Sequence, residues 1–272
     1  MRTVTPARAA LAGILGFGYV YVGRVRVALV LLGVGLAATA LAAWTRLIFI
    51  PVVLYSVIAV LFAVAAATIV HPIVIAAGTS SPPQKRYNRW WFYCLWLAGI
   101  VLITDQLVRH RGDLLGYETF RIPSVSMTPT LQRGDFILVD AWAYTEALPQ
   151  VGDVVVYEHE SGLDYVKRIV GTPGDLVEIR ADALIVNGAP VPEPYLAPDT
   201  SVPFRWRNAA ALLLADGEYY VLGDNRPNSQ DSRIHGPVNI ERIVGRVRLI
   251  WFSTAGWQRF PARLERTDAL PE

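Results

Sequence analysis

The fold is decided by residues 90–108, which read WWFYCLWLAGIVLITDQLV. This run is apolar as far as Asp105, and a helix of about 20 apolar residues is long enough to cross a bilayer. It opens on two tryptophans, followed closely by a tyrosine, the residue types that gather at membrane interfaces. We therefore expect this run to be a membrane span that separates two different halves of the chain.

The two halves differ in charge and in composition. Residues 1–108 hold 8 Lys/Arg against 1 Asp/Glu, whereas the rest of the chain holds 17 against 22. The whole chain is 53% hydrophobic with a mean hydropathy of +0.34, which is too apolar for an ordinary soluble enzyme. The composition therefore excludes a single soluble domain, a disordered chain and a nucleic-acid binder with a basic face.

Residues 1–108 are expected to form a membrane region with three or four transmembrane helices. The first apolar run is short and holds three glycines, so it is either a fourth span or a re-entrant element. No small-x-small cleavage site follows it, and we do not expect a removable signal peptide. The four runs cover approximately residues 9–22, 27–44, 47–77 and 90–108.

The basic loops predict the orientation. With four spans, the N-terminus and the C-terminal domain lie on the same side of the membrane. The loops on the other side are the basic ones, and the positive-inside rule places them in the cytoplasm. We therefore expect a multi-pass protein of the cytoplasmic (inner) membrane with its large domain on the periplasmic or extracellular side. The loop residues that decide this are Arg24, Arg26, Lys85, Arg86 and Arg89.

Residues 109–272 are expected to form an extracytoplasmic β domain. Short runs of β-forming residues alternate with turn signals such as Asn187-Gly188, which favours antiparallel sheets. The fold class is therefore an α-helical multi-span membrane anchor plus a mainly-β domain. A weak helical candidate covers residues 208–215. The β-type runs are residues 136–139, 154–157, 166–170, 176–179, 184–186, 219–222 and 244–252.

Lysine usage points to a catalytic residue in this domain. Of the 25 basic residues only Lys85 and Lys167 are lysines. An arginine cannot lose its proton in a protein, whereas a buried lysine can be tuned towards the neutral amine. Lys167 lies in an apolar β-type run, so it is a candidate general base, the alternative being a surface lysine on a strand edge.

Two further segments offer partners for such a base. Residues 122–131, IPSVSMTPTL, place four hydroxyl residues around two stiffening prolines, and read either as a rigid loop that presents a hydroxyl or as a Ser/Thr/Pro linker. Residues 223–233, GDNRPNSQDSR, are dense in donors and acceptors that would pin a base from behind. The alternative there is a polar surface loop with a local Asp231–Arg233 ion pair.

Together these segments resemble the three signature boxes of bacterial type I signal peptidases, the leader peptidases with a Ser-Lys dyad. The boxes fall within residues 117–140, 152–175 and 219–236, in the order of that family. The resemblance covers roughly Tyr117 to Arg263. It implies a catalytic domain of signal peptidase/LexA-like β fold and a membrane-bound serine endopeptidase that removes N-terminal signal peptides from exported preproteins.

The resemblance also implies residue roles. Ser126 is then the nucleophile that forms an acyl-enzyme, and Lys167 is its general base. The Ser124 hydroxyl and the Ser126 backbone N–H form the oxyanion hole. Cleavage follows small residues at the −1 and −3 positions. Three residues support the dyad without taking part in the chemistry: Ser229, which orients the lysine, and the pair Asp231 and Arg233.

Partners and alternatives follow from the same resemblance. The implied partners are exported preproteins, the lipid bilayer and the secretion translocon, with no nucleic acid. No cofactor or metal is expected, because the histidines lack metal-ligand spacing and the lone Cys94 lies in an apolar run. The alternatives are a Ser-Lys peptidase with a narrow substrate (pilin or conjugation protein maturation), a catalytically inactive preprotein-binding membrane protein, and a Ser-His-Asp hydrolase that uses His235 near Asp231.

Three aromatic residues near the C-terminus, Trp251, Phe252 and Trp257, have two readings. Large aromatic side chains most often fill a domain core. The second reading is that some of them dip into the lipid interface beside the active site.

Overall fold

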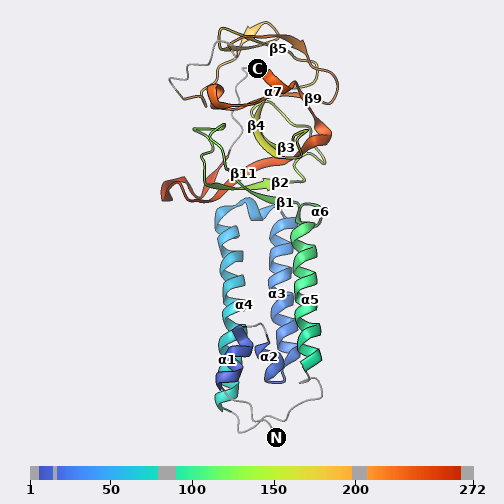
Figure 1. Cartoon of the computed structure of the whole chain (residues 1–272), viewed down its shortest axis with the longest axis vertical. Helices are drawn as coiled ribbons and strands as arrows, with labels where there is room; N and C mark the ends of the chain where they lie inside the picture. The colour runs from blue at the N-terminus through green and yellow to red at the C-terminus, as the bar shows by residue number, and fades with distance from the viewer. Residues whose placement is uncertain (1–5, 15–16, 79–89, 198–206, 265–272) are drawn as a thin grey trace. The chain divides into compact units, whose positions relative to one another are not determined.

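The chain divides into two compact units, Met1–Leu115 and Gly116–Glu272 (Figure 1). The first is helical and the second is built from antiparallel strands, so the predicted fold class is confirmed. The computed structural model describes residues 6–14, 17–78, 90–197 and 207–264.

Among the described residues of the first unit, three helices are long and apolar enough to cross a membrane. Large apolar side chains are exposed along all three, as helices that face lipid require. Pro51 occupies the first position of its helix, where its missing N–H leaves no hydrogen bond unmade. The three helices are α3 (Val25–Trp44), α4 (Pro51–Gly78) and α5 (Trp90–Arg109), and the single turn η1 (Leu47–Phe49) lies between α3 and α4.

The first apolar run does not form a continuous span. It is divided between α1 (Pro6–Ile14) and α2 (Gly18–Tyr21), and both short helices pack against α4 (Figure 1). A Cβ on Gly13 would come within 2.9 Å of the Ile69 backbone, so this glycine permits the close helix contact. Whether this segment is a fourth span or a re-entrant element stays a prediction.

A polar contact also joins this N-terminal segment to α4. The buried Tyr19 hydroxyl lies 2.8 Å from Nδ1 of His71, and the two rings meet edge to face. A Cβ on Gly18 would come within 2.8 Å of the Pro72 ring, which makes this a second close contact that depends on glycine. Gly13 and Gly18 therefore serve packing against α4.

The second unit contains a larger and a smaller antiparallel sheet. The larger sheet, in spatial order, consists of β1 (Tyr117–Arg121), β2 (Asp135–Asp140), β11 (Ile243–Ser253), β3 (Val154–Glu158), β4 (Asp164–Gly171), β9 (Glu218–Leu222) and β10 (Val238–Asn239), with β12 (Ala262–Arg263) paired to β11. The smaller sheet has the order β7 (Ala189–Pro190), β6 (Ala183–Val186), β5 (Leu176–Arg180) and β8 (Ala209–Leu213). The short helical segments are α6 (Arg111–Leu115), in the first unit, and α7 (Ser232–His235), η3 (Arg226–Asn228), η4 (Ile240–Arg242) and η5 (Trp257–Arg259) in the second.

The helix suggested for residues 208–215 is wrong. These residues contain strand β8, which pairs with β5 through Val177↔Leu212 and Ile179↔Ala209. Alanine and leucine favour helix by less than about 1 kcal/mol per residue. The backbone hydrogen bonds to β5, together with burial of Leu214 in the adjoining core, outweigh that preference.

The core under the larger sheet also fixes a loop. Met127 and Leu131, from the segment that follows β1, are fully buried against Ile137 and Val139 of β2 and Val154 of β3. The loop is therefore fastened by its apolar side chains, and the hydroxyl residues between them remain at the surface of the core.

A buried ion pair joins three distant parts of the second unit. Nε and Nη2 of Arg168 donate to the two carboxylate oxygens of Asp224 at 2.9 and 2.8 Å, and these side chains are only 2% and 1% exposed. The Thr130 hydroxyl donates to the same carboxylate at 2.5 Å, and Nη1 of Arg168 donates to the Gly152 carbonyl at 3.0 Å. Every strong donor here has an acceptor, which offsets the cost of burying two charges.

We predict that Arg168→Met lowers the free energy of unfolding by about 3–5 kcal/mol, because it leaves the Asp224 carboxylate buried without its partner. Arg180→Met is the matched control: it breaks an arginine–carboxylate pair with Glu178 in which the arginine is 68% exposed, and should cost no more than about 1 kcal/mol. Denaturant titration of the full chain in detergent, followed by near-UV circular dichroism, measures both. Equal midpoints for the two variants would contradict the assignment.

Candidate active site

The predicted nucleophile lies on the loop that follows β1. The loop is held at its start by reciprocal bonds: Ile122 N–H donates to the Asp135 carbonyl and Gly134 N–H to the Ile122 carbonyl, both at 2.8 Å. Met127, next to Ser126, is buried in the core. Ser126 itself is only half-buried and lines a cavity. The hydroxyls of Ser124 and Ser126 lie 3.2 Å apart.

Lys167 lies on β4, opposite Val155 of β3, and its side chain reaches the same loop. Its Nζ is 3.1 Å from the Ser126 Oγ and 2.9 Å from the Val166 carbonyl oxygen. The residue is 4% exposed. Burial lowers the pKa of Lys167 to about 8, against the opposing effect of the carboxylates of Asp231 and Asp224. The site therefore brings a hydroxyl into contact with an amine that loses its proton more readily than a free lysine.

The third predicted segment fastens the nucleophile loop from the opposite side. Asn225 donates twice to this loop, from its backbone N–H to the Ser126 carbonyl at 2.9 Å and from Nδ2 to the Val125 carbonyl at 3.0 Å. Gly223 permits this approach, since a Cβ there would lie 2.6 Å from the Ser126 carbonyl oxygen and closer still to Ser229 Oγ. A side chain at 223 would have to push the two segments apart.

The predicted supporting residues lie directly behind this contact. Asp231 caps α7 and accepts hydrogen bonds from Gly223 N–H at 3.0 Å and from Nε and Nη2 of Arg233, both at 2.8 Å. The Asp231–Arg233 pair is buried, contrary to the surface-loop alternative. Ser229 is 5% exposed, and its Oγ has no hydrogen-bond partner among the described residues. Its role in orienting Lys167 therefore stays a prediction.

A cavity of about 380 Å³ opens in front of the hydroxyl and the amine. Beside it, β3 pairs with β4 along Asp164–Arg168, whereas β9 pairs with β4 only from Arg168 onward. The described strands thus leave the second edge of β4 unpaired from Asp164 to Val166. The cavity walls include Ile122, Ser124, Ser126, Met127, Tyr165 and Lys167.

The structure also describes most of the residues named in the other predictions, those on His235, the C-terminal aromatic residues and metal binding. The ring of His235 packs edge to face on His159, at 4.6 Å between centroids, rather than serving a serine. Trp251 is half-buried, while Trp257 is 86% exposed at the end of an aromatic cluster that includes Phe252 and Phe260. No group of three or more His, Cys, Asp or Glu gathers as metal ligands within the described ranges. The basic residues Arg2, Lys85, Arg86 and Arg89 lie outside them.

Sequence reasoning missed the residues that tie the three boxes together. Thr130, Arg168, Asp224 and Asn225 were read only as parts of motifs, yet they form the contacts between them. One signal was available for Arg168, because an arginine inside an apolar β-type run must find a buried acceptor. Nothing in the sequence identified Asp224 as that acceptor.

The family model described as signal peptidase, peptidase S26, matches residues 94–252. Among curated proteins, a signal peptidase I of Bacillus caldolyticus is 34% identical over 174 residues, which is 60% of this chain and 90% of that protein. A probable signal peptidase I-1 of Synechocystis is 32% identical over 145 residues, 50% of this chain and 71% of that one. A signal peptidase IB of Staphylococcus aureus is 37% identical over 141 residues, which is 47% of this chain and 74% of that protein.

Among solved structures, the chain is similar to the crystal structure of a signal peptidase I from Enterococcus faecalis V583. The identity is 33%, the match covers 36% of this chain and 96% of that chain, and the TM-score is 0.32. The family match and the identity across most of the Bacillus relative agree with the resemblance of the three boxes. This chain belongs to the signal peptidase family of serine endopeptidases.

Proposed function

We propose that this protein is a membrane-bound signal peptidase that removes signal peptides from exported preproteins with a Ser126–Lys167 dyad. The observation that carries the proposal is the 3.1 Å contact between Ser126 Oγ and the buried Lys167 Nζ. Hydrogen-bond contact between a hydroxyl and a base of lowered pKa is the signature of an activated nucleophile.

The geometry supports an acyl-enzyme mechanism. Neutral Lys167 takes the hydroxyl proton while Ser126 Oγ attacks the scissile carbonyl carbon. The resulting ammonium gives this proton to the leaving amine, and the neutral amine then activates the water that hydrolyses the acyl-enzyme. The second contact of Nζ, with the Val166 carbonyl, holds the amine beside Ser126 through both steps.

Ser124 suits stabilisation of the tetrahedral intermediate. Its hydroxyl lies 3.2 Å from Ser126 Oγ, close to where the developing oxyanion would form. Together with the backbone N–H of Ser126 it would supply two donors. The backbone of Ser126 is fixed for this purpose by the hydrogen bond from Asn225 N–H.

Cleavage after small residues at −1 and −3 fits the open edge of β4. A substrate segment that pairs with the free edge of Asp164–Val166 is extended, so its side chains at −1 and −3 point to the same face and the −2 side chain points to the other. On that face they meet a cavity walled by Ile122, Met127 and Tyr165. These bulky side chains favour small residues at both positions.

Membrane attachment and orientation are part of the same proposal. With α3, α4 and α5 as the spans, the two ends of the chain lie on opposite sides of the membrane. Arg8 then joins Arg24 and Arg26 on the side that also receives the basic α4–α5 loop, while the other side holds few basic residues in its short segments. With three spans the difference in basic residues between the two sides is larger than with four, so the positive-inside rule favours an extracytoplasmic catalytic unit more strongly. The exposed Trp257 would suit contact with the lipid interface.

We predict that Ser126→Ala and Lys167→Arg each lower kcat/KM by about a thousandfold or more for a preprotein whose signal peptide ends in Ala-x-Ala. Lys167→Arg keeps a positive charge but cannot supply a neutral amine. Lys85→Arg is the control, since it makes the same change at the chain's other lysine and should cleave like the unaltered protein. Cleavage by either dyad variant at the control rate would refute the dyad. Failure of the unaltered protein on this substrate would favour the narrow-substrate alternative.

We predict an acidic limit to activity set by Lys167. The amine must be neutral to act, and burial lowers its pKa to about 8. Below that value the neutral fraction falls tenfold for each pH unit, so kcat/KM should fall with the same slope as the pH drops from 8 to 6. The measurement is a pH series of initial rates in detergent. A flat profile across that range would contradict a lysine base.

We predict the orientation through cysteine labelling. Cys94 is the only cysteine in the sequence, so Cys94→Ser gives a background for single additions. A membrane-impermeant maleimide should label Ala147→Cys, on an exposed site of the catalytic unit, in intact cells. It should label Ala7→Cys, an exposed site in α1, only after the membrane is permeabilised. The reverse pattern would place the catalytic unit in the cytoplasm.

A further inference from the structure

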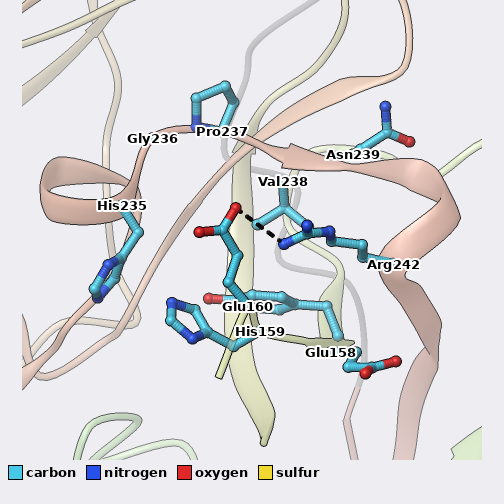
Figure 2. Close-up of a pocket in the computed structure, with 10 residues that line it drawn as sticks. Glu158, His159, Glu160, His235, Gly236, Pro237, Val238, Asn239 and Arg242 are labelled. Atoms are coloured by element: carbon cyan, nitrogen blue, oxygen red, sulfur yellow. Dashed lines mark hydrogen bonds and ion pairs between the residues drawn. The ribbon is translucent and has the colours of Figure 1, made fainter. Parts of the chain in front are cut away.

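A second cavity, of about 220 Å³, lies at the turn between β3 and β4 (Figure 2). Two imidazoles meet there: His159 comes from the turn and the exposed His235 from α7, with 4.6 Å between ring centroids. Glu160 and Arg242 form an ion pair across the same cavity at 3.4 Å. None of these residues belongs to the proposed catalytic machinery, but His159 contacts Tyr165, which lines the catalytic cavity.

His159 stacks on Tyr165. The two rings lie almost parallel, at 10°, with their centroids 4.6 Å apart. Strand register explains the contact. Tyr165 is opposite Tyr157, and the His159 N–H donates to the Leu163 carbonyl at 2.9 Å. His159 therefore lies diagonally across from Tyr165, two residues closer to the turn. Lys167 lies one step the other way along β4, on the same face of the strand.

Tyr165 connects this stack to the proposed dyad. Its ring centroid is 5.3 Å from the Lys167 Nζ, and its side chain lines the catalytic cavity together with Ser126. The amine therefore lies over the face of a ring that is itself part of the cavity wall. Two neighbours limit the rotation of this ring: Tyr157 meets it edge to face, with 6.0 Å between centroids, and His159 stacks on its face.

We propose that His159 is a positioning residue of the active site, which holds the Tyr165 ring over the Lys167 amine. The inference rests on the proposed role of Lys167 as the base. Because burial keeps this amine readily deprotonated, the ring matters as a shield from water. The attraction between an ammonium and a ring face acts in the opposite sense, but the Nζ lies near the outer limit of that interaction, at 5.3 Å from the ring centroid, and burial has the largest effect on the pKa of this amine. Loss of the stack should therefore admit water and favour the ammonium form.

The imidazole is itself held in place. Ser161 N–H and the Ser161 hydroxyl lie 3.2 and 3.0 Å from the His159 Nδ1, and the edge of His235 closes one side. The charged and titratable groups around it are Tyr157 and Glu158 on β3, Glu160 in the turn, His235 on α7 and Arg242 on η4. His159 thus offers a fixed flat surface to Tyr165, and flatness rather than charge is the property that the stack requires.

The test compares His159→Ala with His159→Phe, which keeps a flat ring without a titrating group. In His159→Ala the acidic midpoint of the kcat/KM profile should rise by about half a pH unit, which cuts the neutral amine about threefold at neutral pH. In His159→Phe the midpoint and the rate should stay close to those of the unaltered protein. Glu160→Gln is the control, because it changes a charge in the same turn without touching either ring.

Three results would overturn the inference: an unchanged midpoint in His159→Ala, a midpoint that moves to lower pH, or a His159→Phe variant that behaves like His159→Ala. Lys167→Arg, assayed in parallel, separates this failure from that of the proposed function. If Lys167→Arg is inactive while His159→Ala behaves like the unaltered protein, the positioning role of His159 is refuted and the dyad stands. If Lys167→Arg cleaves normally, the dyad fails and the role of His159 with it.

Discussion

The catalytic unit depends on one buried interaction, the two-pronged ion pair between Arg168 and Asp224. The arginine follows Lys167 on β4, the carboxylate follows Gly223 after β9, and Thr130 brings the nucleophile loop to the same carboxylate. Any movement of one segment would leave a charge buried without a partner, which is among the costliest defects a domain core can carry. The distances between the proposed nucleophile, base and supporting residues are therefore consequences of a charge constraint outside the reacting groups.

The same arrangement explains the state of the lysine. Burial favours the neutral amine, while the carboxylates of Asp231 and Asp224 favour the ammonium, and burial is the larger effect. Each carboxylate is already bound to its own arginine, Arg233 in one case and Arg168 in the other. These arginines reduce the field that the carboxylates exert at Lys167. Acidic side chains therefore lie near Lys167 while burial still lowers the pKa of its amine to about 8.

The sequence was most informative where one residue type had few physical options. The scarce lysine made Lys167 a candidate base, and the resemblance of the three segments to a known family assigned the roles of Ser126 and the supporting residues. The β-type runs located most strands of the larger sheet. Prediction failed where long-range pairing decides. Residues 208–215 favour helix locally but pair with β5. The partners of Arg168 and the stack of His159 on Tyr165 also depend on contacts across the fold, which periodicity and composition do not contain.

The unpaired edge of β4 has a consequence for the range of cargo. A backbone edge offers the same donors and acceptors to every extended peptide, whatever its side chains are. Binding along such an edge does not depend on the side chains at most positions of the bound segment. It restricts side-chain size only at the positions whose side chains enter the cavity. A peptidase built this way accepts many unrelated proteins and rejects most bonds within each of them, because a folded region cannot supply a free extended segment with small side chains at the right places.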